Sequence, residues 1–169
     1  MELKSPEQLL ADMCQQLKTH LAARSIDDPA MVGIHTGGVW VANALHSMLD
    51  IREPLGTLDI SFYRDDFSRI GMSPEVKPSK LPFSVDDQHI ILVDDVLYTG
   101  RTIRAALNEL FDYGRPASVT LATMIVRGGR EIPISADVSG CQLELAPGQQ
   151  IKLKGPDPLS ISIVEVTES

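Results

Sequence analysis

The feature that most constrains the fold is a nearly continuous apolar run, HIILV, at residues 89–93. A run without polar alternation is typical of a strand that is buried on both faces of a parallel sheet. Two adjacent carboxylates, Asp94 and Asp95, follow directly, and we expect the strand to end at them. A helix is expected to open near Thr102. The run therefore predicts a strand–loop–helix unit at the centre of the molecule.

Helical and strand-like patterns alternate along the rest of the chain. We expect strands at 31–34, 57–63 and 119–125, and helices from 6 to about 24, around 42–49 and over 102–111. In the last helix the apolar face is expected to include Phe111. Such alternation predicts an α/β fold with a mostly parallel sheet flanked by helices. Alternating Leu159, Ile161 and Ile163 predict a β-rich C-terminal tail.

The segment from Arg64 to Pro82 is polar and rich in proline, and it lacks periodicity. Ordinary connections run about 4–6 residues, and much longer ones are often lids or binding loops. We therefore expect a long mobile loop inside the domain. No repeat, low-complexity tract or linker divides the chain, so residues 1–169 are predicted to form a single domain.

The charge and cysteine content exclude several classes of protein. The formal net charge is −8, which argues against a main role in binding a phosphate backbone. Cys14 and Cys141 lie far apart with no CxxC or Cys/His cluster, so no disulfide framework or metal-ligand set is expected, and a cytoplasmic location fits best. No stretch approaches the roughly 20 apolar residues of a membrane span. The first four residues lack the apolar region of a secretory signal.

Residues 94–102, DDVLYTGRT, carry the strongest chemical signal. Ligands of parallel α/β sheets bind outside the carboxyl ends of the strands, where Asp94 and Asp95 are expected to stand. Backbone N–H groups from about Val96 to Thr102, with the positive end of the next helix, predict an anion-binding cradle. Because two carboxylates would repel a phosphate, we expect them to face sugar hydroxyls or Mg²⁺. The pattern predicts a site for a phosphorylated sugar.

The stretch VDDVLYTGRT at 93–102 resembles the phosphoribosyl-pyrophosphate (PRPP) binding motif of the type I phosphoribosyltransferases. Further blocks resemble the pyrimidine-operon regulators of that family, which also have uracil phosphoribosyltransferase activity. These blocks are GTLDI at 56–60 leading to YRDD at 63–66, GRP at 114–116 and RGGREIPI at 127–134. The resemblance spans roughly Ser5 to Asp137 and implies the type I phosphoribosyltransferase fold.

The resemblance implies roles for the residues that match. The two acids would bind the ribose 2′ and 3′ hydroxyls, residues 97–102 the 5′-phosphate, and residues 36–38 the pyrophosphate. Arg64 would neutralise pyrophosphate when the long loop closes, and residues 127–133 would surround the base. The candidate catalytic residues are Asp94, Asp95 and Arg64, and the candidate substrate-binding residues are Thr36, Gly37, Gly38, Val96, Leu97, Tyr98, Thr99, Gly100, Arg101, Thr102 and Arg127.

The implied reaction makes UMP and pyrophosphate from uracil and PRPP, with Mg²⁺ bound mainly through PRPP. The implied second role is UMP-dependent RNA binding in attenuation of pyrimidine genes. The expected partners are therefore PRPP, uracil, UMP or UTP and the leader mRNA of pyrimidine genes, with no membrane. A homodimer or larger homo-oligomer is expected as well.

Three positions depart from the family pattern. Family members carry an arginine where this chain has Gly37, and their common DRGHRELP block reads VRGGREIP here, with Val126 and Gly129. The first helix offers few cations, Lys18 and Arg24 being the nearest to its centre. Two alternatives therefore stay open: a nucleotide-sensing RNA-binding regulator with little catalysis, and a phosphoribosyltransferase for another base. A receiver domain fits poorly, because its acidic pair would follow the first strand.

Overall fold

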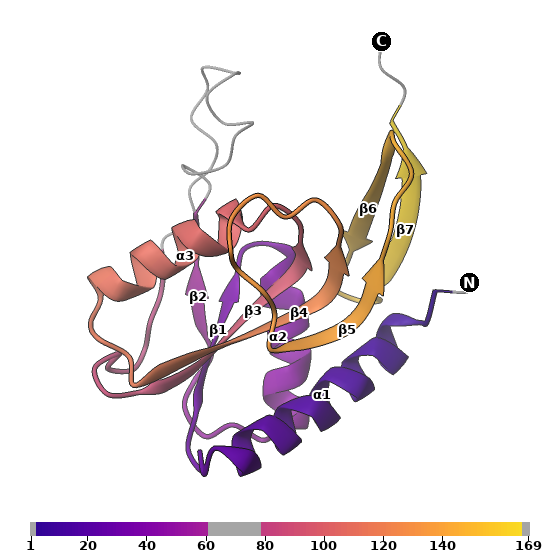
Figure 1. The fold of residues 1–169 in the computed structure, drawn as a ribbon. Coiled ribbons are helices and arrows are strands. Elements are labelled where there is room, and N and C mark those ends of the chain that lie inside the picture. The colour runs from indigo at the N-terminus through magenta and orange to yellow at the C-terminus, as the bar shows by residue number, and fades with distance from the viewer. Residues whose placement is uncertain (1–2, 61–78, 167–169) are drawn as a thin grey trace.

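The computed structural model describes residues 3–60 and 79–166 (Figure 1). Five parallel strands form its central sheet in the order β2-β1-β3-β4-β5, which confirms the α/β prediction. A separate pair of antiparallel strands, β6 and β7, lies beside the sheet. The strands are β1 (Ala30–Ile34), β2 (Gly56–Leu58), β3 (His89–Leu97), β4 (Ser118–Arg127), β5 (Val138–Leu143), β6 (Gln149–Lys154) and β7 (Ser160–Glu165).

The apolar run that anchors the prediction forms the middle of the sheet. Ile91 and Val93 belong to one hydrophobic core, and Ile90 and Leu92 belong to a second core on the opposite face. Since successive side chains of a strand point to opposite faces, a strand with a core on each side must be apolar at every position. The lack of alternation in this run is therefore explained by burial on both faces.

Helices α1 (Pro6–Ala23) and α2 (Gly37–Met48) contribute to the same core as Ile91. Helix α1 begins with a capping box, in which the Gln8 backbone N–H donates to Ser5 Oγ (3.2 Å) and the Ser5 N–H donates to Gln8 Oε1 (3.1 Å). Pro6 at the first helical position suits the fixed φ of a helix start. Capping and the apolar stripe together explain why α1 forms where the sequence predicts it.

Helix α3 (Arg101–Asp112) contributes to the core on the opposite face of the sheet. Ile103, Ala106 and Leu110 are buried there as predicted. The prediction that Phe111 shares this face is wrong, because its side chain is 53% exposed. Phe111 lies one residue, about 100°, around the helix from Leu110, in the last turn.

The β6–β7 hairpin confirms the predicted β-rich tail. Its apolar side chains, with those of the connecting segment, pack against the core beneath α1 and α2. Lys152 and Lys154 alternate with them and are exposed. The packed residues are Ile151, Leu153, Leu159 and Ile161.

Several predicted boundaries need correction. The strand expected over 57–63 is β2, which ends at Leu58, and residues 61–63 lie outside the described part of the chain. Most of the predicted Arg64–Pro82 loop also lies outside it. At the loop's end, Lys80 and Thr57 exchange two backbone hydrogen bonds of 2.7 and 2.8 Å. Strand β5 was not predicted, because VSGCQL has little apolar character and lies at a sheet edge.

In the described ranges, no helix is long and apolar enough to cross a membrane.

Candidate functional site

The central strand carries the acidic pair. Both acids lie inside β3, which continues to Leu97, so the prediction that the strand ends at them is wrong. Pairing of residues 96 and 97 with β4 extends the strand. Asp94 is buried at 3% exposure, and Asp95 is half-buried. The backbone N–H of Asp95 donates to Asp94 Oδ1 (2.8 Å), and that of Val96 donates to Asp95 Oδ1 (2.9 Å).

Gly37 and Gly38 lie directly against this pair. They form the first turn of α2 rather than a free loop, and Thr36 is the exposed residue that precedes it. A Cβ on Gly37 would overlap the Asp95 carboxylate, and a Cβ on Gly38 would lie 2.7 Å from the backbone oxygen of Val93. Only residues without a side chain allow this close approach. The structure thus brings together two motifs that are more than 50 residues apart.

The turn from β3 into α3 forms a second wall. It consists of Tyr98, Thr99 and Gly100, and the Arg101 backbone N–H donates to Thr99 Oγ1 (3.2 Å). Gly100 occupies the N-cap position of α3 and offers no side chain to the helix, so the Thr99 hydroxyl is the side-chain group that accepts from its first N–H. The first N–H groups of a helix have no partner within the helix and favour anions. The predicted anion cradle therefore has its N–H donors at this turn.

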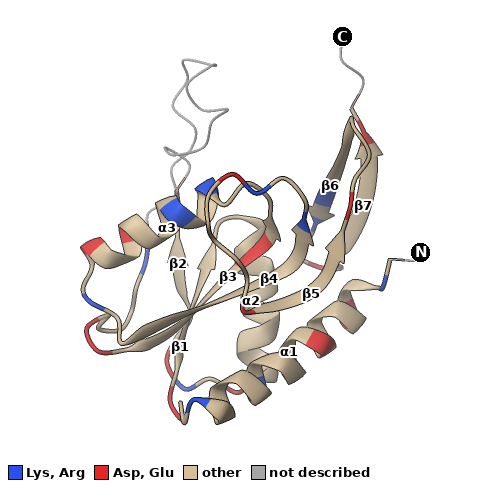
Figure 2. Cartoon of the chain, in the orientation of Figure 1, with Lys and Arg blue, Asp and Glu red and all other residues tan. Residues whose placement is uncertain are grey.

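Helix α3 carries its charges in the unfavourable order. Arg101 and Arg104 lie in its first turn, and Glu109 and Asp112 lie toward its end, as the blue and red segments of Figure 2 show. The helix dipole favours acids at the start and bases at the end. An arrangement that opposes the dipole lowers helix stability, but it concentrates positive charge where an anion would bind.

The segment 128–133 packs over the same turn. The backbone N–H groups of Glu131 and Ile132 donate to the Thr99 carbonyl at 3.0 and 3.2 Å. Arg130 donates to the Tyr98 carbonyl, and Arg101 Nε forms an ion pair with Glu131 (3.1 Å). These contacts hold the predicted base-binding block beside the predicted phosphate loop.

Arg127 and Tyr98 form a stacked pair at this junction. The Arg127 guanidinium carbon lies 3.8 Å from the centroid of the Tyr98 ring, which is a cation–π distance. A Cβ on Gly129 would overlap the ring at Cε1, and Gly129 has a φ of +118°. The family's histidine therefore could not replace Gly129 without moving Tyr98.

The predicted site residues fall into three groups. Asp94, Asp95, Gly37 and Gly38 meet at the carboxyl end of β3, with Thr36 next to them. The second group begins with Val96 and Leu97 at the end of β3 and continues through the adjoining turn into the start of α3. Arg64 lies outside the described residues. The members of the second group are Val96, Leu97, Tyr98, Thr99, Gly100, Arg101, Thr102 and Arg127, which stacks on Tyr98.

Arg130 and Glu131 were not predicted as site residues. Both hold the segment 128–133 on the turn after β3. Their place in the same block as Arg127 was the available signal in the sequence. The sequence pattern indicates that this block surrounds the base. It does not indicate which residues, about 30 positions away in the chain, its side chains contact.

Residues 7–155 match the family model described as the phosphoribosyl transferase domain. The chain is 63% identical over 157 residues to the bifunctional protein PyrR of Nitrosococcus oceani, with 92% of this chain and 89% of that protein covered. It belongs to the PyrR branch of the phosphoribosyltransferase family. Bifunctional protein PyrR of Pseudomonas aeruginosa (strain LESB58) is 58% identical and covers 95% of this chain and 95% of its own length.

Solved structures agree on the fold of this PyrR-family chain. A hypoxanthine-guanine phosphoribosyltransferase from Bacillus anthracis superposes with a TM-score of 0.69 at 17% identity, covering 89% of this chain and 86% of its own. A hypoxanthine phosphoribosyltransferase from Trypanosoma cruzi gives a TM-score of 0.66 at 18% identity, covering 86% of this chain and 79% of its own. The type I phosphoribosyltransferase fold expected from the sequence is confirmed.

Proposed function

We propose that this PyrR-family protein transfers the phosphoribosyl group of PRPP to N1 of uracil, forming UMP and pyrophosphate. The observation that carries the proposal is the packing of Gly37 and Gly38 against Asp94 and Asp95, beside the start of α3, where the N-cap residue is Gly100. A carboxylate pair next to an anion cradle suits a ligand that combines hydroxyl groups with phosphates.

PRPP fits this arrangement in one orientation. The ribose 2′ and 3′ hydroxyls donate to Asp94 and Asp95, and the 5′-phosphate accepts from the N–H groups of residues 98–102. The pyrophosphate then lies toward residues 36–38, at the start of α2. Arg101 and Arg104 add positive charge near the 5′-phosphate. Each negatively charged part of the substrate thus faces N–H donors or guanidinium groups, and its hydroxyls face the acids.

The site suits a magnesium ion that arrives with the substrate. In the described ranges no group of three or more His, Cys, Asp or Glu side chains could hold a metal. Mg²⁺ commonly keeps several waters and binds through one or two carboxylates together with substrate phosphates. Asp95 is the half-buried carboxylate that would contact such an ion or its water shell. When bound, the ion supplies charge that stabilises the departing pyrophosphate.

The base subsite is proposed at the Arg127–Tyr98 stack. Arg127 Nε is buried and has no hydrogen-bond partner within the described part of the chain. A buried donor without a partner is unfavourable unless a ligand or water accepts from it. A uracil carbonyl oxygen is an acceptor of the required kind.

The reaction follows from this positioning. The bond between ribose C1 and the pyrophosphate oxygen breaks, and its electron pair leaves with pyrophosphate. Positive charge develops on the ribose ring while N1 of uracil bonds to C1 and gives its proton to water. Asp94 and Asp95 hold the ribose in place, and the N–H groups and arginines stabilise the phosphates. Catalysis is therefore mainly positioning and electrostatic stabilisation.

The test is formation of UMP from uracil and PRPP with Mg²⁺. We expect turnover by the wild type and a loss of roughly 10- to 100-fold in kcat/KM for Asp95→Asn, since a charge-assisted hydrogen bond is lost. Asp112→Asn, which removes an exposed acid at the far end of α3, is the matched control and should retain full activity. An Asp95→Asn enzyme as active as wild type would contradict the role given to Asp95.

A thermal-shift panel tests the choice of base. A ligand that binds only the folded state raises the apparent unfolding temperature. We expect UMP with Mg²⁺ to raise it more than GMP or AMP. A larger shift with a purine nucleotide would favour a phosphoribosyltransferase for another base.

Regulation by RNA binding is the second candidate function. It is favoured by the relatives, which are named bifunctional. The expected behaviour is UMP-dependent, salt-sensitive binding to the leader transcript of a pyrimidine operon. Affinity for that leader no greater than for random RNA at physiological salt would exclude this function.

Three further expectations complete the proposal. The 169 residues act as one phosphoribosyltransferase domain, in the cytoplasm, as a homodimer or larger homo-oligomer. Exposed apolar side chains on α3, at Phe111, and at Tyr113 just beyond it, support association. Light scattering coupled to size-exclusion chromatography measures the oligomer, and a monomer at micromolar concentration would contradict that expectation.

A further inference from the structure

The turn of the β6–β7 hairpin lies against the first turn of α2. A Cβ on Gly155, in the hairpin turn, would lie 3.1 Å from Cε3 and 3.2 Å from Cδ2 of Trp40, so the hairpin backbone packs directly on the indole ring. The same Cβ would lie 2.7 Å from Cδ2 of Leu159, at the other end of the turn. Two segments that are far apart in the chain thus meet at the Trp40 side chain.

Trp40 belongs to the part of α2 beside which the pyrophosphate of PRPP is proposed to lie. It follows Gly37 by three residues, so the two positions are neighbours on one side of the helix. The backbone N–H of Trp40 donates to the Thr36 carbonyl (3.4 Å), and that of Val39 donates to the same oxygen (3.2 Å). A displacement of the indole ring is therefore passed to residues 36–38 through one helical turn.

The hairpin is fixed firmly enough to support the indole ring. Its two strands pair in register along the whole of β6, and its apolar side chains pack against the core that α1 and α2 share. Protein interiors are close-packed and transmit strain. The Trp40 ring is therefore held between a helix and a hairpin that are both anchored in the same core.

We propose that Trp40 is a positioning residue, through which the hairpin turn directs the N–H groups at the start of α2 toward pyrophosphate. This role rests on the proposed function and names a support for one half of the substrate. The first N–H groups of a helix bind an anion only when they point at it. The 5′-phosphate and the base are bound elsewhere in the proposed complex, at the turn after β3 and at Arg127.

The two products of the proposed reaction separate this role from a merely structural one. Inorganic pyrophosphate with Mg²⁺, and UMP, are each titrated by calorimetry into the full chain. We expect Trp40→Ala to weaken pyrophosphate binding about tenfold, since a displacement of 1 Å can cost more than that, and UMP binding less than about twofold. The KM for PRPP should rise with the loss of pyrophosphate affinity, and the KM for uracil should not change. Trp40→Phe, which keeps an aromatic ring at this position, should recover most of the affinity.

A variant of the hairpin tests the contact from its other side. Alanine suits the Gly155 backbone, whose φ lies outside the left-handed region, but its Cβ requires the indole ring to move by a few tenths of an ångström. We expect Gly155→Ala to weaken pyrophosphate binding about two- to fivefold and to leave UMP binding unchanged. Trp40 is the only tryptophan of the sequence, so tryptophan emission reports on this contact. Magnesium pyrophosphate should change that emission more than UMP does.

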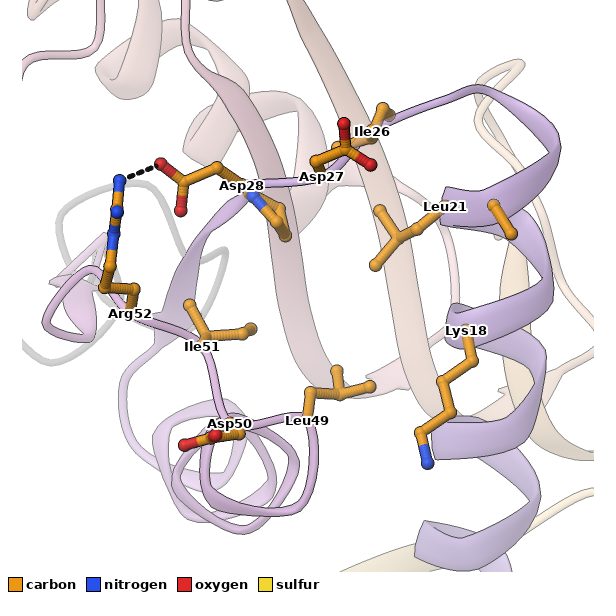
Figure 3. Close-up of a pocket in the computed structure, with 11 residues that line it drawn as sticks. Lys18, Leu21, Ile26, Asp27, Asp28, Leu49, Asp50, Ile51 and Arg52 are labelled. Carbon is orange, nitrogen blue, oxygen red and sulfur yellow. Dashed lines mark hydrogen bonds and ion pairs between the residues drawn. The ribbon is translucent and has the colours of Figure 1, made fainter.

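The far end of α2 supplies the matched control. The helix leads there into Leu49 and Asp50, which line a pocket with Lys18 of α1 (Figure 3). Met48, in the last turn of α2, is 44% exposed. Met48→Ala therefore removes an apolar side chain from the same helix at the end away from the hairpin contact, and its affinities for both ligands should equal those of wild type. Thermal unfolding checks that each variant folds.

Equal losses of pyrophosphate and UMP affinity in Trp40→Ala would show a structural role alone and would overturn the positioning role. Unchanged pyrophosphate affinity in both Trp40→Ala and Gly155→Ala would overturn it as well. If Trp40→Ala does not fold, Gly155→Ala carries the same comparison of the two ligands. Wild-type protein that binds UMP but not pyrophosphate would overturn the role of Trp40 alone, whereas wild-type protein that binds neither would overturn the proposed function with it.

Discussion

Gly37 and Gly38 are neighbours in the chain, but a side chain at each would meet a different kind of atom. At Gly37 the obstacle is the Asp95 carboxyl group, which can rotate. At Gly38 the nearest obstacle is the backbone carbonyl of Val93, 2.7 Å from the position of a Cβ, which cannot move without moving the strand. The same substitution should therefore affect function at one position and stability at the other.

We predict that Gly37→Ala lowers kcat/KM for PRPP by about tenfold or more without lowering the unfolding temperature. Displacement of a positioning group by about 1 Å can cost a factor of that size or larger, while alanine favours the helix. Gly38→Ala should instead lower the free energy of unfolding by about 1–3 kcal/mol, as overpacking does. Urea denaturation and steady-state kinetics on both variants make the comparison, and a stable Gly38→Ala protein would contradict it.

The thiol of Cys141 should be slow to react. Burial raises the pKa of Cys141, and the nearby Lys4 charge opposes this only in part. In the unfolded chain the thiol ionises at a lower pH, so this residue's contribution to stability decreases as pH rises above the ordinary thiol range. We expect alkylation of Cys141 by iodoacetamide to be slower than that of glutathione between pH 8 and 9, and to become comparable in guanidinium chloride. Mass spectrometry of the labelled peptide measures the rate, and labelling at the glutathione rate would refute the raised pKa.

At the scale of elements, Gln16 joins α1 to the edge strand β5. Its Nε2 donates to the Ser139 carbonyl (2.7 Å), and its Oε1 accepts from the Ser139 N–H (3.3 Å). Edge strands expose backbone groups that can pair with another chain, and the Gln16 side chain occupies the N–H and carbonyl groups of Ser139. We predict that Gln16→Ala lowers the free energy of unfolding by about 1 kcal/mol. Gln15→Ala, an exposed neighbour, is the control for urea denaturation and should be within ~0.3 kcal/mol of wild type.

We expect the charge order of helix α3 to lower the stability of the protein and to strengthen anion binding. Arg104 lies in its first turn, where a cation opposes the helix dipole. We predict that Arg104→Gln raises the free energy of unfolding by about 0.3–1 kcal/mol at low salt and weakens PRPP binding severalfold. Arg115→Gln, beyond the end of α3, is the matched control. A destabilised Arg104→Gln protein with unchanged PRPP affinity would contradict this account of the charge order.

At the scale of the whole molecule, a net charge of −8 restricts the partners. Local N–H groups and arginines can bind a small polyanion in an acidic protein, but the net negative charge repels a long phosphate backbone. We predict no measurable binding of random RNA at physiological salt in a filter-binding or gel-shift assay. Micromolar affinity for random RNA under those conditions would show that a basic surface outweighs the net charge.

Local patterns predicted most of the sheet and helices because burial imposes them. The HIILV run placed the central strand, and the capping box at Ser5 placed the start of α1. Strand β5 was missed since an edge strand needs few apolar residues. The end of β3 was misplaced because the carboxylates follow the run directly, while pairing with β4 carries the strand to Leu97.

The sequence by itself determined the fold class, the family, and the region that carries the chemistry, because these depend on periodicity and contiguous motifs. Only the tertiary structure decided which atoms meet. It placed Gly37 against Asp95 and stacked Arg127 on Tyr98. Such contacts join residues far apart in the chain, and their geometry depends on how strands and helices pack, which no local pattern encodes.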